Sequence, residues 1–575
     1  MWSTKHEKLL PPATAPSASG SKSEEHQSTD SSEADHEVAQ RSEGSAIQEE
    51  EMLPAASPTS QPPPTMTSSR RDSGAFTDSL SAIRQQLHRS TVPEFLLHLP
   101  TMLVEYYFNY VCQIFSSFDG TMNPFRSTVG KLWDGSAPIY YAIQSMAAAY
   151  LANHFPRMSP VGVQMQRETY RCLYQVQQGR GELVENLDKT LLTVLLVGQT
   201  TAWHNPKDLG LMHLKTAKRL NRRRLEQQGS QLESRARRQN EFFEQCILYW
   251  DMLAGFVDDD VDEFGFGENA VTNSKTPDIE VSPSNNKETK VFPHPWTGVA
   301  PKVQKLFAQV GRLIRSYRKS IAQDASALNY LSLDLGFDLQ FPQNSIAVVE
   351  AISEAQALEE ELLLFQPPSA STLVDAGDEN TPVQQYIYLA EAYRCAGLLE
   401  IYRVFPSILF KRVPLTNHTF PSASSTNASQ QIFEFLPIPA SQTPDDFLIS
   451  LAIHTMSLLE KLPSTSGTRC LQPIVVIAAA SELRFSSASM SNPLDPFAPA
   501  SSNPIFSSIT NREVDIASAR QFATTRLQEF QLSLPAKPVL KALQLIQETW
   551  ARADLGQDVF WMDVMEEMGW ESIFG

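Results

Sequence analysis

Apolar side chains recur at helical spacing over most of the chain beyond about residue 93. The clearest stretch lies between residues 103 and 118, where one broad apolar stripe predicts an amphipathic helix. Gly120 is expected to end it in a left-handed conformation, and Asn123-Pro124 prevents helical continuation. Ser136 is expected to cap a second helix that runs to Leu151 with a matching apolar face. Together they predict an αα unit. The stripe consists of Leu103, Tyr107, Tyr110, Val111, Ile114, Phe115 and Phe118.

The same periodicity predicts further helices down to the last residues of the chain. No strand-like alternation of useful length competes with it. The expected fold class is therefore all-α, a large multi-helix bundle. Further helices are expected over 183–197, 213–217, 242–250, 303–317, 346–365, 382–406, 447–462, 471–482, 512–530, 538–550 and 558–570.

Polar segments interrupt this pattern. Residues 1–90 are rich in Ser, Thr, Pro and Glu and carry few large apolar residues, so they are expected to form a disordered tail. The helical domain is expected to cover 91–575, with polar inserts near 262–292, 411–442 and 485–509.

Composition narrows the class of protein. The chain has 575 residues and a formal net charge of -18, so it repels nucleic acid at long range, and DNA contact would need a local basic module. It contains no apolar run long enough for a transmembrane helix and no signal-peptide core. Its five cysteines are widely spaced, without a CxxC pair, which favours buried free thiols and an intracellular location.

Four segments, in order, carry a resemblance to a known family. They are the aromatic-rich EYYFNYV helix with NPFR and SAPIYYAIQSMAAAYLA, the helix around residues 383–406, the helix at 471–482, and the tryptophan-bearing end at 558–570. This series resembles the fungal-specific transcription factor domain, an all-helical regulatory region that usually follows a six-cysteine binuclear zinc cluster. Six thiolates hold the two zinc ions of such a cluster. This sequence has no such set of cysteines.

The resemblance implies a nuclear transcriptional regulator or co-regulator of a fungal metabolic or biosynthetic gene set, without enzymatic activity, catalytic residues, cofactor or metal site. The expected partners are the transcription machinery or a DNA-binding protein, and homo- or heterodimers are consistent with this role. The missing cluster puts direct sequence-specific DNA binding in doubt. The chain would then act as a co-regulator, bind DNA through a dimer partner, or derive from a truncated gene model.

A basic region is the candidate nuclear-import signal. Two clusters about ten residues apart resemble a bipartite signal that meets acidic grooves on a carrier. A solvated helix face and a phosphate-contacting patch are the alternatives. The candidate residues are Lys218, Arg219, Arg222, Arg223, Arg224, Arg235, Arg237 and Arg238.

An acidic motif supports a different class of function. Asp258-Asp259-x-x-Asp262 resembles the aspartate motif with which all-helical terpenoid enzymes bind Mg²⁺ and a diphosphate. The second metal motif of those enzymes is not found downstream. A solvated loop and an acidic-aromatic interaction patch explain the same residues, so the terpenoid enzyme is the alternative hypothesis.

Overall fold

The computed structural model describes residues 98–178, 184–228, 234–258, 290–335, 346–412, 443–485 and 510–575. The predicted tail at 1–90 and most of the three predicted polar inserts lie outside these ranges. Within them, β-structure is confined to two isolated bridges, Val291 with Leu373 and His294 with Gly298. Helices make up the rest of the regular structure, which confirms the all-α prediction.

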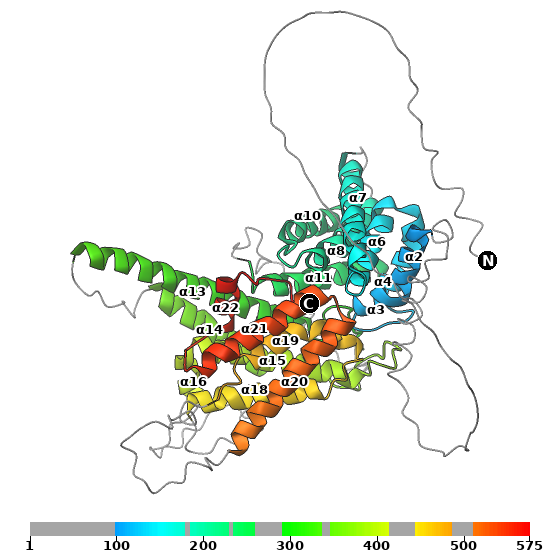
Figure 1. Ribbon diagram of the computed structural model, residues 1–575. Helices are drawn as coiled ribbons and strands as arrows, with labels where there is room; N and C mark the ends of the chain where they lie inside the picture. Colours follow the sequence, from blue (N-terminus) through cyan, green and yellow to red (C-terminus); the bar gives the residue numbers. More distant parts are fainter. Residues whose placement is uncertain are drawn as a thin grey trace, which may run out of the picture. The chain divides into compact units, whose positions relative to one another are not determined.

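The first half of the described chain packs around two buried helices (Figure 1). Helix α6 contacts α2, α7 and α8, and α8 contacts α10. These elements begin with α2 (Leu99–Tyr106), a π-helical segment η3 (Tyr107–Val111), α3 (Cys112–Ile114), α4 (Pro124–Ser127), α5 (Val129–Leu132) and η4 (Trp133–Gly135). They continue with α6 (Ala137–Leu151), η5 (Pro156–Met158), α7 (Ser159–Gln178), α8 (Val184–Gln199), α9 (Thr201–His204), α10 (Leu211–Gln228) and α11 (Ser234–Ala254).

The second half packs around α15, which contacts α13, α14, α18 and α19. Helix α11 contacts both α10 and α13, and so joins the two halves. The elements are α13 (Pro301–Leu335), α14 (Ile346–Leu364), α15 (Val383–Val404), α16 (Pro406–Arg412), α18 (Pro444–Glu460), η6 (Gly467–Leu471), α19 (Pro473–Ala480), α20 (Asn511–Ser533), α21 (Ala536–Asp554) and α22 (Trp561–Met568).

The predicted αα unit is present, but its first helix is not regular. Five residues, Tyr107–Val111, form a π-helical turn between α2 and α3, and helical structure stops at Ile114 rather than near Phe118. Gly120 has a positive φ of 112°, but it lies six residues beyond Ile114, so it does not end the helix as predicted. Ser136 occupies the N-cap position of α6, yet its side chain makes no capping hydrogen bond there.

Capping residues set the ends of several other helices. Asn123 accepts a hydrogen bond from the Phe125 amide and begins α4. Thr443 begins α18 and Thr510 begins α20, each in a reciprocal capping box with the acidic residue three positions on. These side chains satisfy amide groups that the first helical turn leaves without partners.

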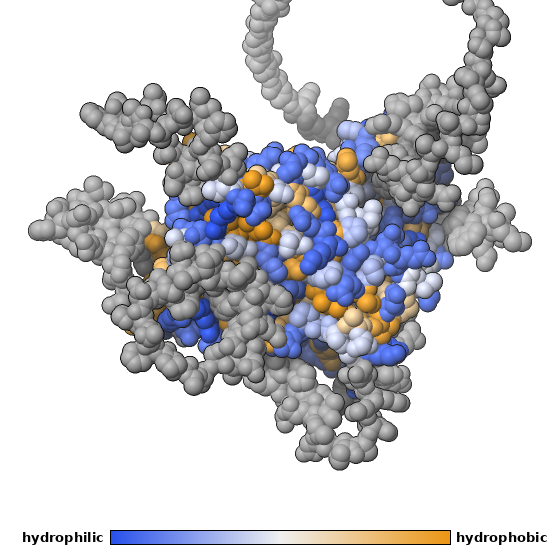
Figure 2. Space-filling model, turned by 90° about the horizontal axis from the view of Figure 1, so that it is seen from below, coloured by the Kyte–Doolittle hydropathy of each residue, from blue (hydrophilic) through white to orange (hydrophobic). Residues whose placement is uncertain are grey.

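The surface mixes polar and apolar residues. Figure 2 shows apolar patches interrupted by polar side chains on the face it presents. The most exposed large apolar residues belong to different parts of the chain, such as Met212 in α10, Ile346 in α14 and Leu555 after α21. Scattered exposure of this kind is normal for a folded domain. None of the described helices is both long and apolar enough to span a membrane.

Candidate functional site

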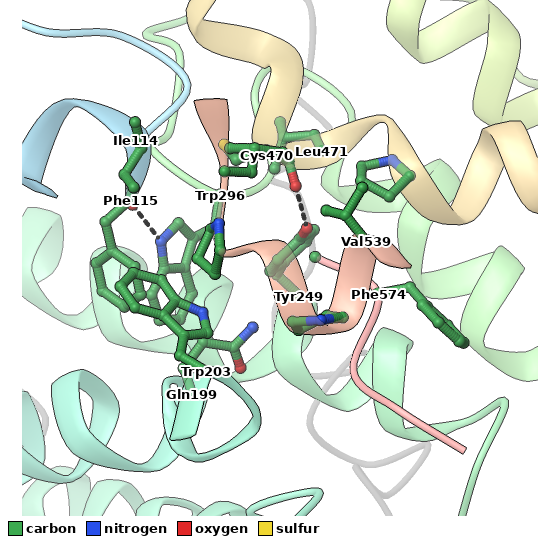
Figure 3. A pocket seen from close by; sticks show the side chains of 15 residues that line it. Ile114, Phe115, Gln199, Trp203, Tyr249, Trp296, Cys470, Leu471, Val539 and Phe574 are labelled. Atoms are coloured by element: carbon green, nitrogen blue, oxygen red, sulfur yellow. Dashed lines mark hydrogen bonds between the residues drawn. The ribbon is translucent and has the colours of Figure 1, made fainter. Parts of the chain in front are cut away.

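The two halves of the helical domain meet at a pocket (Figure 3). Its wall comes from α3 and the residue after it, α8, α9, α11, η6, α19, α21 and the last two residues of the chain. The pocket has a volume of about 30 Å³, which is room for about two water molecules. The lining residues are Ile114, Phe115, Gln199, Trp203, Tyr249, Trp296, Cys470, Leu471, Pro473, Leu534, Pro535, Pro538, Val539, Phe574 and Gly575.

Three aromatic rings form one wall of this pocket. The Phe115 ring meets Trp203 edge to face at 5.8 Å between centroids and meets Trp296 edge to face at 5.1 Å. The indole N–H of Trp296 donates a hydrogen bond of 2.8 Å to the Phe115 carbonyl. Offset and edge-to-face contacts of this kind stabilise the cluster beyond its burial. These contacts pack the residue that follows α3 against α9 and the Trp296 loop.

Polar groups in the pocket are few. The Tyr249 hydroxyl donates its hydrogen to the Cys470 carbonyl oxygen at 3.1 Å, so the hydroxyl has no hydrogen left to donate to a bound molecule. Gln199 projects from α8 beside Trp203 and is 4% exposed, and its Oε1 has no hydrogen-bond partner. A buried amide oxygen of this kind is an acceptor for a water molecule or for a small donor group.

The groups that line the pocket are poorly suited to acid–base or nucleophilic chemistry. Its thiol, Cys470, has a pKa raised to about 12 because the side chain is buried, so little reactive thiolate forms. Burial likewise raises the pKa of Tyr249 well above its usual value. The other lining side chains are aromatic or aliphatic apart from Gln199.

The opposite wall contains the end of the chain. Phe574 is 3% exposed, and Gly575 lies against the Tyr249 ring and Leu253. A side chain at position 575 would collide with the Tyr249 hydroxyl. Sequence periodicity did not identify this site. Its lining residues are scattered between positions 114 and 575, and each element contributes only one or two side chains, so no local motif marks the pocket.

The predicted import residues occupy two kinds of environment. Arg219, Arg222 and Arg223 are exposed on α10, whereas Lys218 is 10% exposed and pairs with Asp251 at 2.6 Å. On α11, the side chains of Arg237 and Arg238 are exposed. Arg235 belongs to α11, and its side chain lies outside the described ones.

Arg224 belongs to the core rather than to the basic surface. Its side chain is fully buried, and its Nε donates to Asp188 at 2.5 Å. The same guanidinium donates to Asn221 and Asn240 and lies 4.7 Å from the centroid of the Phe243 ring. Buried charges require such partners. Lys218 and Arg224 therefore join α10 to α8 and α11, and the role of the other six residues in import stays a prediction.

The acidic motif can be placed only in part. Asp258 follows α11, and its amide donates to the Ala254 carbonyl at 2.8 Å. This bond extends the helical hydrogen-bond pattern beyond the last residue of α11. Asp259 and Asp262 lie outside the described residues.

The five cysteines are all buried and free, as their apolar neighbourhoods predicted. Burial raises the pKa of each thiol. They lie in separate helical elements and so form no paired-thiol site.

Comparison with known proteins supports the family predicted from the sequence. The family model described as the fungal specific transcription factor domain matches residues 102–575. No curated protein and no solved structure shows a significant match. The family is regulatory and non-enzymatic, so it supports a role as a transcriptional regulator and gives no support to the terpenoid enzyme. The match extends over most of the chain, and the chain therefore belongs to the fungal specific transcription factor domain family.

Proposed function

We propose that the chain acts in the nucleus as a transcriptional regulator or co-regulator of a fungal metabolic or biosynthetic gene set. The observation that carries this proposal is the family match over residues 102–575, which includes nearly every described helix. The regulator acts through its helical domain, by contact with the transcription machinery or with a DNA-binding partner.

A tethering experiment tests the regulatory role. The full chain is fused to an unrelated DNA-binding domain and placed on a reporter promoter that carries the matching site. Recruitment is expected to change reporter output in either direction relative to the DNA-binding domain alone. A fusion that occupies the promoter, as chromatin immunoprecipitation shows, and leaves output unchanged would contradict the proposal.

Nuclear entry is proposed to use the exposed part of the basic region. Arg219, Arg222 and Arg223 leave their charge at the surface of α10, where an acidic carrier can reach it. Arg237 and Arg238 supply the second cluster on α11. Arg224 cannot serve this purpose without unfolding its surroundings, because its guanidinium is buried between Asp188 and Asn240.

Localisation of a fluorescent fusion tests this entry route. The double change Arg222→Gln and Arg223→Gln is expected to reduce nuclear accumulation, while Arg224 stays intact so that folding is preserved. The matched control is Arg157→Gln with Arg171→Gln, two exposed arginines outside the two basic clusters. Equal nuclear signal in both double variants would remove the basic region from the proposal.

A further inference from the structure

Helix α15 packs against α18 (Figure 1). Three side chains of kinds that bind metal ions come together between these helices. Glu391 and Cys395 are one turn apart on α15, and His454 belongs to α18. One ligand atom from each of the three lies within 4.8 Å of the other two. The sequence did not indicate this group, because only the Glu–Cys spacing of four is local and the histidine comes from another helix.

The spacing of the ligand atoms suits zinc. Tetrahedral Zn²⁺ with a Zn–S bond of about 2.3 Å and a Zn–O bond of about 2.1 Å separates the sulfur from the oxygen by about 3.6 Å. The Cys395 Sγ lies 3.7 Å from the Glu391 Oε1, so these two atoms already stand at that separation. The imidazole nitrogen lies within 4.8 Å of both atoms, and a tetrahedral site with a Zn–N bond of about 2.0 Å needs separations of about 3.5 Å.

Burial and charge also suit a cation. Cys395 is 1% exposed, while Glu391 and His454 are partly exposed, so the group opens to solvent on its outer side. A thiolate and a carboxylate supply two negative charges to Zn²⁺, although the Arg394 guanidinium offsets part of the carboxylate charge. Arg394 holds the Glu391 carboxylate through its Nε at 2.9 Å and a second nitrogen at 2.5 Å. Hydrogen bonds of this kind fix the orientation of a ligating carboxylate and leave each oxygen a further lone pair.

We propose that Glu391, Cys395 and His454 form a binding site for Zn²⁺, with a water molecule in the fourth position. The metal replaces the proton that the Cys395 thiol directs at Glu391, and this proton passes to solvent. Thiolate, imidazole and carboxylate form a mixed donor set that zinc accepts readily. The bound ion would join α15 to α18 in the part of the domain where both helices are buried.

Metal content and cobalt spectroscopy on the full chain test the site. Protein exchanged with Zn²⁺ and dialysed is expected to retain about one zinc per chain. Co²⁺ in its place should show a thiolate charge-transfer band in the near ultraviolet. Cys395→Ser should abolish that band, and His454→Gln should weaken metal binding by more than about tenfold, the loss that changing a residue hydrogen-bonded to a ligand already causes.

Cys172→Ser is the matched control, because it removes another buried free thiol from a different helix. It should keep both the zinc and the cobalt band. Circular dichroism on every variant identifies loss of fold, and Glu391→Gln, which keeps the volume of the side chain, gives a second reading if Cys395→Ser misfolds. A wild-type chain that retains no zinc, or zinc retained equally by the variants at all three positions, would overturn the proposal.

Discussion

Glu400 is a buried carboxyl whose replacement by glutamine should stabilise the protein. It lies on α15 and is 2% exposed. Its Oε1 accepts a hydrogen bond of 2.7 Å from the Trp561 indole, whereas its Oε2 has no partner. Burial, together with the nearby Glu482 carboxylate, raises the pKa of Glu400 to about 8, although the Trp561 bond and the Arg403 and Arg318 guanidinium groups oppose the shift.

The sign and size of the effect follow from that pKa. The folded state keeps a proton on Glu400 that the unfolded chain, with a glutamate pKa of about 4.5, has already released. The stability tied to this proton is fully present below pH 4.5 and is lost as pH rises through about 8. One pKa unit corresponds to about 1.4 kcal/mol, so the loss is on the order of 1 kcal/mol at pH 5 and 4 kcal/mol at pH 8.

Glu400→Gln removes the ionisation and keeps an acceptor for Trp561. Urea unfolding of both proteins at pH 5 and pH 8 measures the effect. The variant should gain about 3 kcal/mol relative to the wild type between these two pH values. Glu360→Gln, on the exposed face of α14, is the control and should show the same small change at both. A Gln variant that is destabilised equally at pH 5 and pH 8 would show that Glu400 is ionised in the folded protein, and the reasoning would fail.

Three further predictions concern packing, a buried ion pair and acid stability. Gly198→Ala should destabilise the protein by about 1–3 kcal/mol in urea unfolding, because the new methyl group would lie 2.6 Å from the His213 Cβ, whereas Gly130→Ala meets ordinary contacts and should be nearly neutral. Arg224→Met removes a fully buried guanidinium and leaves the partly exposed Asp188 with only its hydrogen bond from Gln239, so it should cost about 3 kcal/mol, whereas the exposed Arg157→Met should cost under about 0.5 kcal/mol. Burial lowers the pKa of His294 to about 3, so its neutral ring should remain neutral in histidine NMR spectra from pH 7 to pH 4. Because the unfolded chain takes up that proton below about pH 6.5, stability should fall by about 2 kcal/mol between pH 7 and pH 5, and a His294 resonance that titrates near pH 6.5 would contradict this.

Local periodicity accounts for most of the fold. The predicted helix at 346–365 is α14 (Ile346–Leu364), and the predicted helix at 512–530 is the core of α20 (Asn511–Ser533). Both carry their own start or stop signals in sequence, such as the Thr510 capping box and the prolines after Phe365. The information needed to place them is therefore local.

Features that depend on distant partners could not be read in this way. Arg224 stands in a run of basic residues, and only the folded chain shows that Asp188 and Asn240 meet it inside the protein. The pocket is a further case, because Gln199 shares its wall with residues as distant in sequence as Phe574. A periodicity reports which face of a helix is apolar, and it carries no information about which distant element covers that face.

The π-helical turn at Tyr107–Val111 has a consequence for how related chains are aligned. Such a turn accommodates one more residue than an α-helical turn of the same height. Each residue of an α-helix rotates the side-chain direction by about 100°. A relative that lacks the extra residue should therefore be aligned with a one-residue gap within these five positions. Only then is its equivalent of Phe115 matched to the residue that packs on the Trp203 and Trp296 rings. An ungapped alignment would match each residue of α3 to a neighbour that points in a different direction.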